Sequence, residues 1–534
     1  MRDKEASPQM ATSYEQSGDA RGTILGHPKG LFILFFAEMW ERFSYYGMRA
    51  LLIFYLTKHW LFSDGEAGVI YGAYTALVYI TPVLGGYLAD RWLGQRKAVL
   101  YGAVILTFGH FLMGFEGTGG QDAASLNIFW LALAFIIVGS GFLKANISVI
   151  VGQLYPRTDA RRDPAYTIFY MGINLGAFLG SLLCGYLGEV YGWSYGFGAA
   201  GVGMLLGLIV FIIGKPYLMG RGEPPKALSK GMEYGLYVVG LGAVVVCWWM
   251  VQNQDVVGTL LGVFGAILVL GIIGYSVVKL PAQDRDRIFA ALFLIFVSIV
   301  FWALFEQAGN SLNLFTDRHV DRSLFGWDVP ASMFQSLNAA YIFLLAPFFA
   351  WGWTILGRKG KEPSAPFKFG LGVIQVGLGF LVLVWGANAA GVSAVPVIFI
   401  FLIYLLHTTG ELCLSPVGLS SMNRLAPAHM ASLIMGTWFF ASATGNFAAG
   451  LISSAAGGEG LEGEEAGREL VLSVYSTVGW YAIGIGVAVL VLSPAIRWLM
   501  HLDTLQDDNV GDDLLGQAEA GEPQAAGMHP ETRG

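Results

Sequence analysis

The sequence predicts an all-α polytopic membrane protein with fourteen transmembrane helices, arranged as two six-helix bundles plus an inserted two-helix pair. Three observations lead to this fold class. Of the 534 residues, 55% are hydrophobic and only 13% are charged, whereas soluble domains carry about 25% charged residues. Apolar runs long enough to span a bilayer recur along the chain. Basic residues gather in every second loop between these runs, as expected for helices that cross a membrane back and forth.

The first apolar run, residues 31–57, differs from the others because it contains four charged residues. At 100° per residue, its polar side chains fall within an arc of about 140°; they are Glu38, Glu41, Arg42, Tyr45, Tyr46 and Arg49. Charged residues inside a membrane helix face the protein interior or a wet cavity. We therefore expect this helix to turn one polar stripe toward a chamber inside the protein.

The other spans follow at short intervals. Each is long enough, at a rise of 1.5 Å per residue, to cross roughly 30 Å of hydrocarbon. The expected spans are 31–57, 66–89, 97–115, 126–151, 166–188, 195–214, 232–251, 256–279, 288–308, 331–356, 367–387, 393–415, 430–454 and 475–500.

Loop charges set the expected orientation. One set of loops carries eighteen Lys and Arg residues, and the alternate set carries four, namely Lys58, Arg318, Arg322 and Arg468. Because basic loops stay in the cytoplasm, we expect a multi-pass protein of the inner (plasma) membrane with both termini cytoplasmic. Residues 1–28 are polar and lack the hydrophobic segment of a signal peptide, so the first helix is expected to direct insertion.

The domain organisation follows from the seventh and eighth spans, which hold ionisable groups only at their ends. We interpret them as an inserted pair. Without them, six plus six spans remain, which is the arrangement of a two-halved transporter with its site between the halves. The expected parts are a cytoplasmic N-terminal segment 1–28, a first bundle 29–214, a linker with the inserted pair 215–280, a second bundle 281–500 and an acidic cytoplasmic tail 501–534.

Seven ionisable residues lie well inside the spans: Glu38, Glu41, Arg42, Arg49, Lys144, Glu306 and Glu411. Depth counted from the loops places Arg49 and Glu306 in the outer half. Lys144 and Glu411 fall in the inner half. Opposite charges at matching depth predict an outer gate pair, Arg49–Glu306, and an inner gate pair, Lys144–Glu411. A single such pair could simply tie helices together, but seven charges and a polar stripe favour function.

These seven charges include one more carboxylate than cations, so the set becomes neutral when one carboxylate binds a proton. A gate pair whose carboxylate is protonated loses its attraction and can open. The charges therefore predict a coupling between proton uptake and conformation.

Motifs that the sequence lacks narrow the function further. It contains no G-x-x-x-x-G-K-[ST] loop, H-E-x-x-H motif or G-x-S-x-G elbow, so we expect neither an ATP-driven pump of that type nor an enzyme. Its cysteines, Cys184, Cys247 and Cys413, are too few and too scattered for a disulfide framework or a metal site. We expect no metal, no cofactor and no nucleic-acid partner. The protein either moves a solute with an ion gradient or binds something in the membrane.

Five motifs resemble, in order, those of the proton-coupled oligopeptide transporters of the major facilitator superfamily. They are Glu38-x-x-Glu41-Arg42-Phe43-x-Tyr45-Tyr46, the loop 85–97, the segment 169–176, the segment 301–307 and the segment 410–419. The resemblance covers roughly residues 25–500, and the inserted pair is similar to that of bacterial members.

We expect a monomer in the lipid bilayer. The resemblance implies a major facilitator fold. It also implies symport of di- and tripeptides, with protons as the coupling ion. By motif match, Arg49 and Lys144 would meet the peptide carboxylate and Glu411 the peptide amine. The remaining implied roles are hydrogen bonds to the peptide backbone from Asn174 and Asn338, side-chain pockets lined by Tyr45, Tyr46, Tyr79, Trp302 and Trp438, and proton handling and gating by Glu38, Glu41, Arg42 and Glu306.

One departure from the family bears on proton coupling. Mammalian members carry a histidine in the second helix, and span 66–89 has none. Glu306 and the Glu38/Glu41 pair are therefore the candidates for proton uptake. Two alternatives stay open: a symporter of another small solute, such as nitrate or an amino-acid derivative, on the same fold, and a receptor or channel-like protein that never cycles. Retention of Glu38, Glu41 and Glu411 favours peptides and protons, and gates at two depths argue against a permanently open pore.

Overall fold

The structure, a computed structural model, describes residues 22–155, 159, 161–457 and 464–502. These ranges contain fourteen helices of at least 19 residues, located where the sequence predicts the fourteen spans, so the predicted fold class is confirmed. The helices are α2 (Lys29–Phe54), α3 (Asp64–Leu88), α4 (Gln95–Met113), α5 (Ala123–Gln153), α6 (Arg162–Val190), α7 (Trp193–Gly214), α8 (Lys230–Gln252), α9 (Gln254–Lys279), α10 (Ala282–Phe305), α12 (Ser336–Arg358), α13 (Ala365–Ala390), α14 (Ile398–Leu425), α15 (Ala431–Gly457) and α16 (Glu464–Leu499).

Some predicted segments lie outside the described residues. They include most of the N-terminal segment 1–28 and nearly all of the tail 501–534.

Eleven helical segments of the described chain are long and apolar enough to cross a membrane by length and composition alone. Helices α2, α4 and α15 are not among them. In α2 the reason is its charge, since Glu38, Glu41, Arg42 and Arg49 fall close together in a 26-residue helix. All four side chains are buried by neighbouring helices, which is the condition under which such a helix persists in a membrane.

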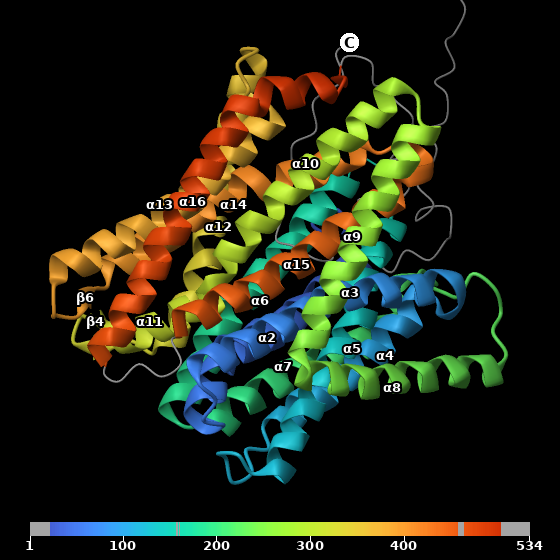
Figure 1. Cartoon of the computed structure of the whole chain (residues 1–534). Helices are drawn as coiled ribbons and strands as arrows, with labels where there is room; N and C mark the ends of the chain where they lie inside the picture. Colours follow the sequence, from blue (N-terminus) through green and yellow to red (C-terminus); the bar gives the residue numbers. More distant parts are fainter. Residues whose placement is uncertain (1–21, 156–158, 160, 458–463, 503–534) are drawn as a thin grey trace, which may run out of the picture.

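The long helices form two bundles around separate hydrophobic cores. In the first bundle, α2 packs along α6 and α4 along α5; in the second, α13 packs along α14 and α16. The first core is built mainly from residues 31–261 and the second from residues 272–500. Figure 1 shows the first bundle in blue and cyan, below the second bundle in yellow to red.

Among the described residues, the most extensive helix contacts between the bundles are those of α3 with α15 and of α6 with α12. The α3–α15 contact depends on small residues. A Cβ built on Gly72 of α3 would lie 2.8 Å from the Cα of Gly450 in α15, so the two backbones meet where neither residue has a side chain. Close backbone approach of this kind is how membrane helices gain packing energy.

The inserted pair, α8 and α9, contacts both bundles. On α8, Glu233 forms an ion pair of 2.6 Å with Lys97 of α4, and the Tyr237 ring stacks on Tyr101 of α4. On α9, Gly258 lies against the Phe447 ring of α15, and Val257 and Leu261 join the first core while Ile272 joins the second. The pair therefore lies against the first bundle on one side and reaches α15 of the second on the other (Figure 1).

The connections add short elements that hydrophobic spans do not predict. Helix α10 ends at Phe305 and continues as a 3-10 turn, η4 (Glu306–Gly309), followed by the short helix α11 (Ser311–His319). A second 3-10 turn, η5 (Ala331–Gln335), leads into α12. The strands are only two residues long: β1 (Thr23–Ile24) pairs with β2 (His27–Pro28), β3 (Val320–Asp321) with β6 (Val395–Pro396), and β4 (Ser323–Leu324) with β5 (Trp327–Asp328).

Candidate transport site

The polar stripe of α2 forms a network within one helix. Arg42 contacts Glu38 one turn earlier, with 2.6 Å between Nη2 and Oε1, and its Nε lies 3.4 Å from Glu41 Oε2. All three side chains are buried. Helix α6 packs closely against α2, since a Cβ on Gly176 would lie 2.1 Å from the Met39 carbonyl oxygen. Two carboxyl groups thus share one guanidinium, so the network carries a net negative charge whenever both are ionised.

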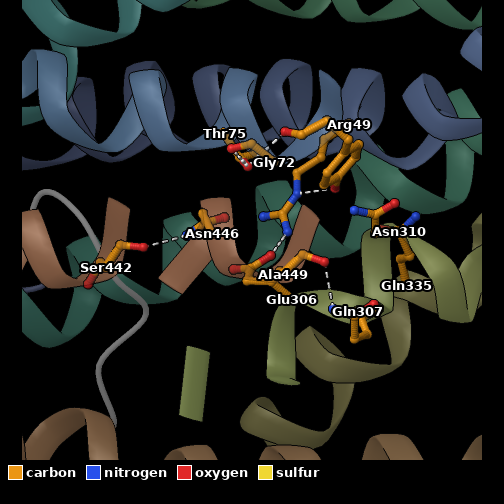
Figure 2. Close-up of polar contacts among 12 residues, drawn as sticks. Arg49, Gly72, Thr75, Glu306, Gln307, Asn310, Gln335, Ser442, Asn446 and Ala449 are labelled. Carbon is orange, nitrogen blue, oxygen red and sulfur yellow. Dashed lines mark hydrogen bonds and ion pairs between the residues drawn. The ribbon is translucent and has the colours of Figure 1, made fainter. Parts of the chain in front are cut away.

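Arg49, further along α2, reaches across to the second bundle. Its guanidinium forms a buried ion pair with Glu306 of η4 (Figure 2). Its Nε also donates to the Tyr71 hydroxyl of α3 at 2.6 Å. The structure therefore brings together the two residues that matching depth predicts as the outer pair, and it adds Tyr71, which sequence reasoning missed.

Further contacts close the same end of the molecule, which is the predicted outer end. Asn310 donates to the Gly68 carbonyl of α3 at 3.2 Å and accepts from Ser453 of α15 at 2.8 Å. Gln335 donates to the Ala50 carbonyl of α2 at 3.2 Å. Asn310 and Gln335 lie beside the Arg49–Glu306 pair (Figure 2).

Two ion pairs near the surface also join the bundles at this end, Arg318 with Asp64 and Lys58 with Asp317. The outer end is therefore closed by direct polar contacts between the bundles.

The predicted inner pair is not formed. Among the ion pairs of the described residues, none joins Lys144 to Glu411. Instead the Lys144 ammonium lies 3.8 Å from the centre of the Tyr45 ring and 5.6 Å from that of Tyr79. Aromatic faces attract a cation through their quadrupole, so Lys144 is held within its own bundle. Matching depth does not decide whether two charges meet, and in this structure, whose predicted outer end is closed, these two do not.

Glu411 interacts with the second bundle instead. Its Oε2 accepts a hydrogen bond from Asn338 Nδ2 of α12 at 2.8 Å, and the same nitrogen donates to Thr408 Oγ1 at 3.1 Å. Thr408 precedes Glu411 by three residues on α14, so both point toward α12 from one helix face. The structure thus brings two predicted residues, Asn338 and Glu411, into direct contact, and it adds Thr408, which sequence reasoning missed.

Of the remaining predicted residues, Tyr46 lies beside one of these charges, whereas Asn174 forms a hydrogen bond within its own helix. Tyr46 places its ring 5.9 Å from the Arg49 guanidinium carbon. Asn174 of α6 donates to the carbonyl of Tyr170, one turn earlier, at 3.2 Å.

The two predicted tryptophans, Trp302 and Trp438, are both buried. The Trp438 ring packs against Gly418 and Phe369 inside the second bundle. In this conformation Trp438 therefore belongs to the bundle core, whereas its predicted place is the lining of a side-chain pocket.

The residues that sequence reasoning missed share one signal. Tyr71, Asn310, Gln335 and Thr408 are polar residues inside or directly beside apolar spans, and each donates or accepts a hydrogen bond with another helix. A lone polar residue in such a span needs a partner. The sequence could have suggested that a partner exists, but it does not identify the helix that supplies it.

The chain is similar to proteins of a known family. Residues 96–457 match the family model described as the POT family. The peptide transporter YePEPT of Yersinia enterocolitica is 38% identical over 469 residues, which cover 83% of this chain and 90% of that protein. The dipeptide and tripeptide permease B of Shigella dysenteriae is 32% identical over 487 residues, covering 90% and 97%.

Solved structures show the same similarity. A crystal structure of a mutant of peptide transporter POT in complex with alafosfalin superposes with a TM-score of 0.79 at 35% identity, covering 92% of this chain and 100% of that one. A POT family transporter in complex with a thioalcohol-conjugated peptide gives a TM-score of 0.76 at 32% identity, covering 89% and 98%.

Proposed function

We propose, because this chain belongs to the POT family, that it is a proton-coupled symporter of di- and tripeptides that works by alternating access. The names of its relatives support a peptide substrate, and so does the peptide-bound structure that it resembles. The fold supports the same conclusion, since two bundles with buried charges between them form the architecture in which one bundle rocks against the other around a central site.

The observation that carries this proposal is the Arg49–Glu306 ion pair between the bundles. It joins a guanidinium of the first bundle to a carboxylate of the second, and both side chains are buried. An ion pair of this kind stabilises the closed outer end only while Glu306 is charged. Removing one partner of a buried pair is strongly unfavourable, so proton binding to Glu306 would favour opening.

The peptide would be recognised by its two charged ends. A zwitterionic peptide brings a cation and an anion a fixed distance apart. Lys144 and Arg49 would attract its carboxylate, and Glu411 would attract its ammonium group. Since Lys144 forms no ion pair with a described residue, its charge is available to a ligand at no cost in broken ion pairs.

The remaining polar and aromatic residues would allow the site to accept peptides with many different side chains. Asn174 and Asn338 would hydrogen-bond the peptide backbone. Tyr45, Tyr46, Tyr79 and Trp302 would line apolar and water-filled space, which suits a site that accepts many side chains.

Protons would serve as the coupling ion, with no other cofactor. Glu306 is the first candidate for proton uptake because it forms the pair between the bundles. The Glu38–Arg42–Glu41 network is the second, because two buried carboxylates there share one cation. In either case, binding of a proton would remove one negative charge from a contact that stabilises one of the alternating conformations.

The protein would act as a monomer in the inner (plasma) membrane with both termini in the cytoplasm. The orientation rests on the asymmetry of eighteen basic loop residues against four, which is the pattern of the positive-inside rule.

Reconstitution into proteoliposomes tests the proposal. Dialanine uptake is expected to rise with an inward proton gradient and to vanish when an uncoupler dissipates that gradient. Uptake of nitrate in place of dialanine would overturn the peptide assignment and favour a different solute on the same fold. Dialanine uptake that is indifferent to the uncoupler would overturn proton coupling.

A further inference from the structure

The contact between α12 and α14 contains a hydrogen-bonded chain whose direction is fixed. Thr408, fully buried, donates its hydroxyl hydrogen to the Tyr404 carbonyl at 2.7 Å. Asn338 Nδ2 lies 3.1 Å from the Thr408 hydroxyl oxygen and 2.8 Å from Glu411 Oε2. Three residues on two helices are thus joined through one side-chain amide.

The chemistry of each group determines which way the amide points. A hydroxyl has a single hydrogen, and Thr408 gives it to Tyr404, so toward Asn338 the hydroxyl can only accept. An ionised carboxylate is also only an acceptor. Both partners of Asn338 therefore require donors, and only the NH₂ end of the amide supplies two. Asn338 must turn its NH₂ group to Thr408 and Glu411 and its Oδ1 away from them.

The remaining oxygen is available to a ligand. Asn338 is partly exposed, and its Oδ1 forms no hydrogen bond with any residue in the described part of the chain. This oxygen lies on the same amide group as the nitrogen that contacts Glu411, the residue that would hold the peptide ammonium. In a peptide, the next donor after the ammonium is the N–H of the first peptide bond, three bonds away.

We propose that Thr408 is a positioning residue for substrate selection: it fixes Asn338 so that Oδ1 accepts the first peptide N–H of a substrate held at Glu411. The inference rests on the proposed peptide transport and deepens it, because it assigns a direction to the hydrogen bond and a reason for that direction. A site that presents a fixed acceptor selects against ligands without a donor at that place, because the acceptor is then left unpaired.

The experiment compares two substrates in three variants. The substrates are dialanine and its ester analogue, in which an oxygen replaces the peptide N–H while both charged ends remain. Thr408→Val removes the hydroxyl at nearly constant shape, and Thr408→Ser restores it. Thr409→Val is the matched control, because within the described part of the chain the Thr409 hydroxyl bonds only to carbonyls of its own helix, at 3.0 and 3.1 Å.

Wild-type protein is expected to bind dialanine about three- to tenfold more tightly than the ester, the contribution of one hydrogen bond. Thr408→Val should lose most of this preference through a raised KM for dialanine, with kcat little changed. Thr408→Ser and Thr409→Val should keep the preference.

Several results would overturn the inference. They are an unchanged preference in Thr408→Val, an equal loss in Thr408→Ser, and an equal loss in Thr409→Val, which would indicate a general disturbance of α14. Failure of the wild type to transport either compound is a distinct result, which would overturn the proposed function and this inference with it.

Discussion

At the scale of single residues, the ion pairs that join the two bundles differ in how far they are buried. Glu306 is 4% exposed and pairs with Arg49, whereas Asp64, in the neighbouring pair with Arg318, is about one quarter exposed. Solvent screens an exposed pair, which contributes about 0–1 kcal/mol. Breaking a buried pair costs roughly 3–5 kcal/mol, because the remaining charge is left unpaired. The two carboxylates are therefore expected to respond differently to neutralisation.

Replacing Glu306 with Gln is expected to spare exchange of peptide across the membrane and to abolish accumulation driven by a proton gradient. The amide keeps the shape of the side chain but can neither bind a proton nor hold Arg49 as a counter-ion. Accumulation and exchange of labelled dialanine in proteoliposomes measure the two effects separately. Asp64→Asn is the matched control and should accumulate peptide as the wild type does. Unchanged accumulation in Glu306→Gln would show that another group couples the proton.

Gly309 controls the second partner of Arg49. A Cβ at this position would lie 2.0 Å from the Tyr71 hydroxyl oxygen, so Gly309→Ala should displace that hydroxyl from Arg49. We expect Gly309→Ala and Tyr71→Phe each to lower the thermal midpoint, by an amount that reflects about 1 kcal/mol for the lost hydrogen bond. The double variant should be no less stable than the less stable single variant, because both remove the same contact. Additive losses in a thermal-unfolding series would refute a shared contact.

At the scale of elements, the N-terminal hairpin is docked at the junction of α5 and α6. Strands β1 and β2 are joined by Leu25 and Gly26, both at positive φ (51° and 80°), as a two-residue primed turn requires. His27 Nδ1 lies 2.8 Å from the Tyr155 hydroxyl, and Arg161 donates to the Gly26 carbonyl at 3.0 Å. The hairpin therefore attaches the start of α2 to the connection between α5 and α6.

This attachment is expected to weaken as the pH falls. Burial lowers the pKa of His27, and the nearby Arg161 guanidinium lowers it further. Because the docked state favours the neutral imidazole, its stabilisation is fully present above about pH 6.5, the unperturbed value, and is lost as the pH falls from there toward the lowered pKa. Amide hydrogen exchange of residues 23–27, corrected for intrinsic rates, should show falling protection below about pH 6.5.

A variant tests whether the imidazole causes this change. His27→Asn cannot titrate and should remove the pH dependence in that range. Hydrogen bonds from Arg161 hold the pKa of Asp159 below its usual value. Its contribution therefore disappears only in more acidic solution, below about pH 4. The same loss of protection near pH 6 in His27→Asn would rule out His27 as its origin.

The elements also show what a sequence can predict. Long apolar runs identify the membrane helices because only hydrophobic segments of that length span a bilayer. The pairing of Arg49 with Glu306 follows from depth, because both lie in outer halves. The short helix α11 and the two-residue strands escape prediction, since they lie in connections where apolar periodicity carries no signal.

The pairing of Lys144 with Glu411 shows what depth in the membrane cannot predict. Depth restricts which charges could meet, but whether they meet depends on how the bundles are tilted. In the same way, the sequence marks Thr408 and Asn310 as polar residues in or beside apolar spans, but their partners are set by helices far away in the chain.

At the scale of the whole molecule, the polar contacts between the bundles at the outer end oppose separation there. The two ends of helix α3 differ in burial: most positions from Gly65 to Tyr79, near the outer end, are buried, whereas most positions from Ile80 to Leu88 are at least partly exposed. Since α3 packs along α15 of the second bundle, a rocking motion that opened the outer end would have to part these two helices. The inserted pair contacts both bundles and would have to bend between α8 and α9, near Asn253, to follow that motion.

A covalent link across the outer end should therefore stop transport without abolishing peptide binding. Arg318 and Asp64 are suited to this test because they meet across the bundles, 2.8 Å apart between Nη2 and Oδ1, and are partly exposed. In Asp64→Cys/Arg318→Cys, a cleavable bifunctional thiol reagent should abolish dialanine uptake, and cleavage of the link should restore it. The three native cysteines are buried and should not react.

Two measurements distinguish a locked transporter from a damaged one. The cross-linked protein in detergent should still bind dialanine, because the link leaves the inner end free to admit peptide. Asp64→Cys alone, treated with the same reagent, should keep its uptake, since no second thiol is within reach. Sustained uptake by fully cross-linked protein would mean that the outer ends of α3 and α11 need not separate during transport. The bundles would then have to move by a route other than rocking about a central site.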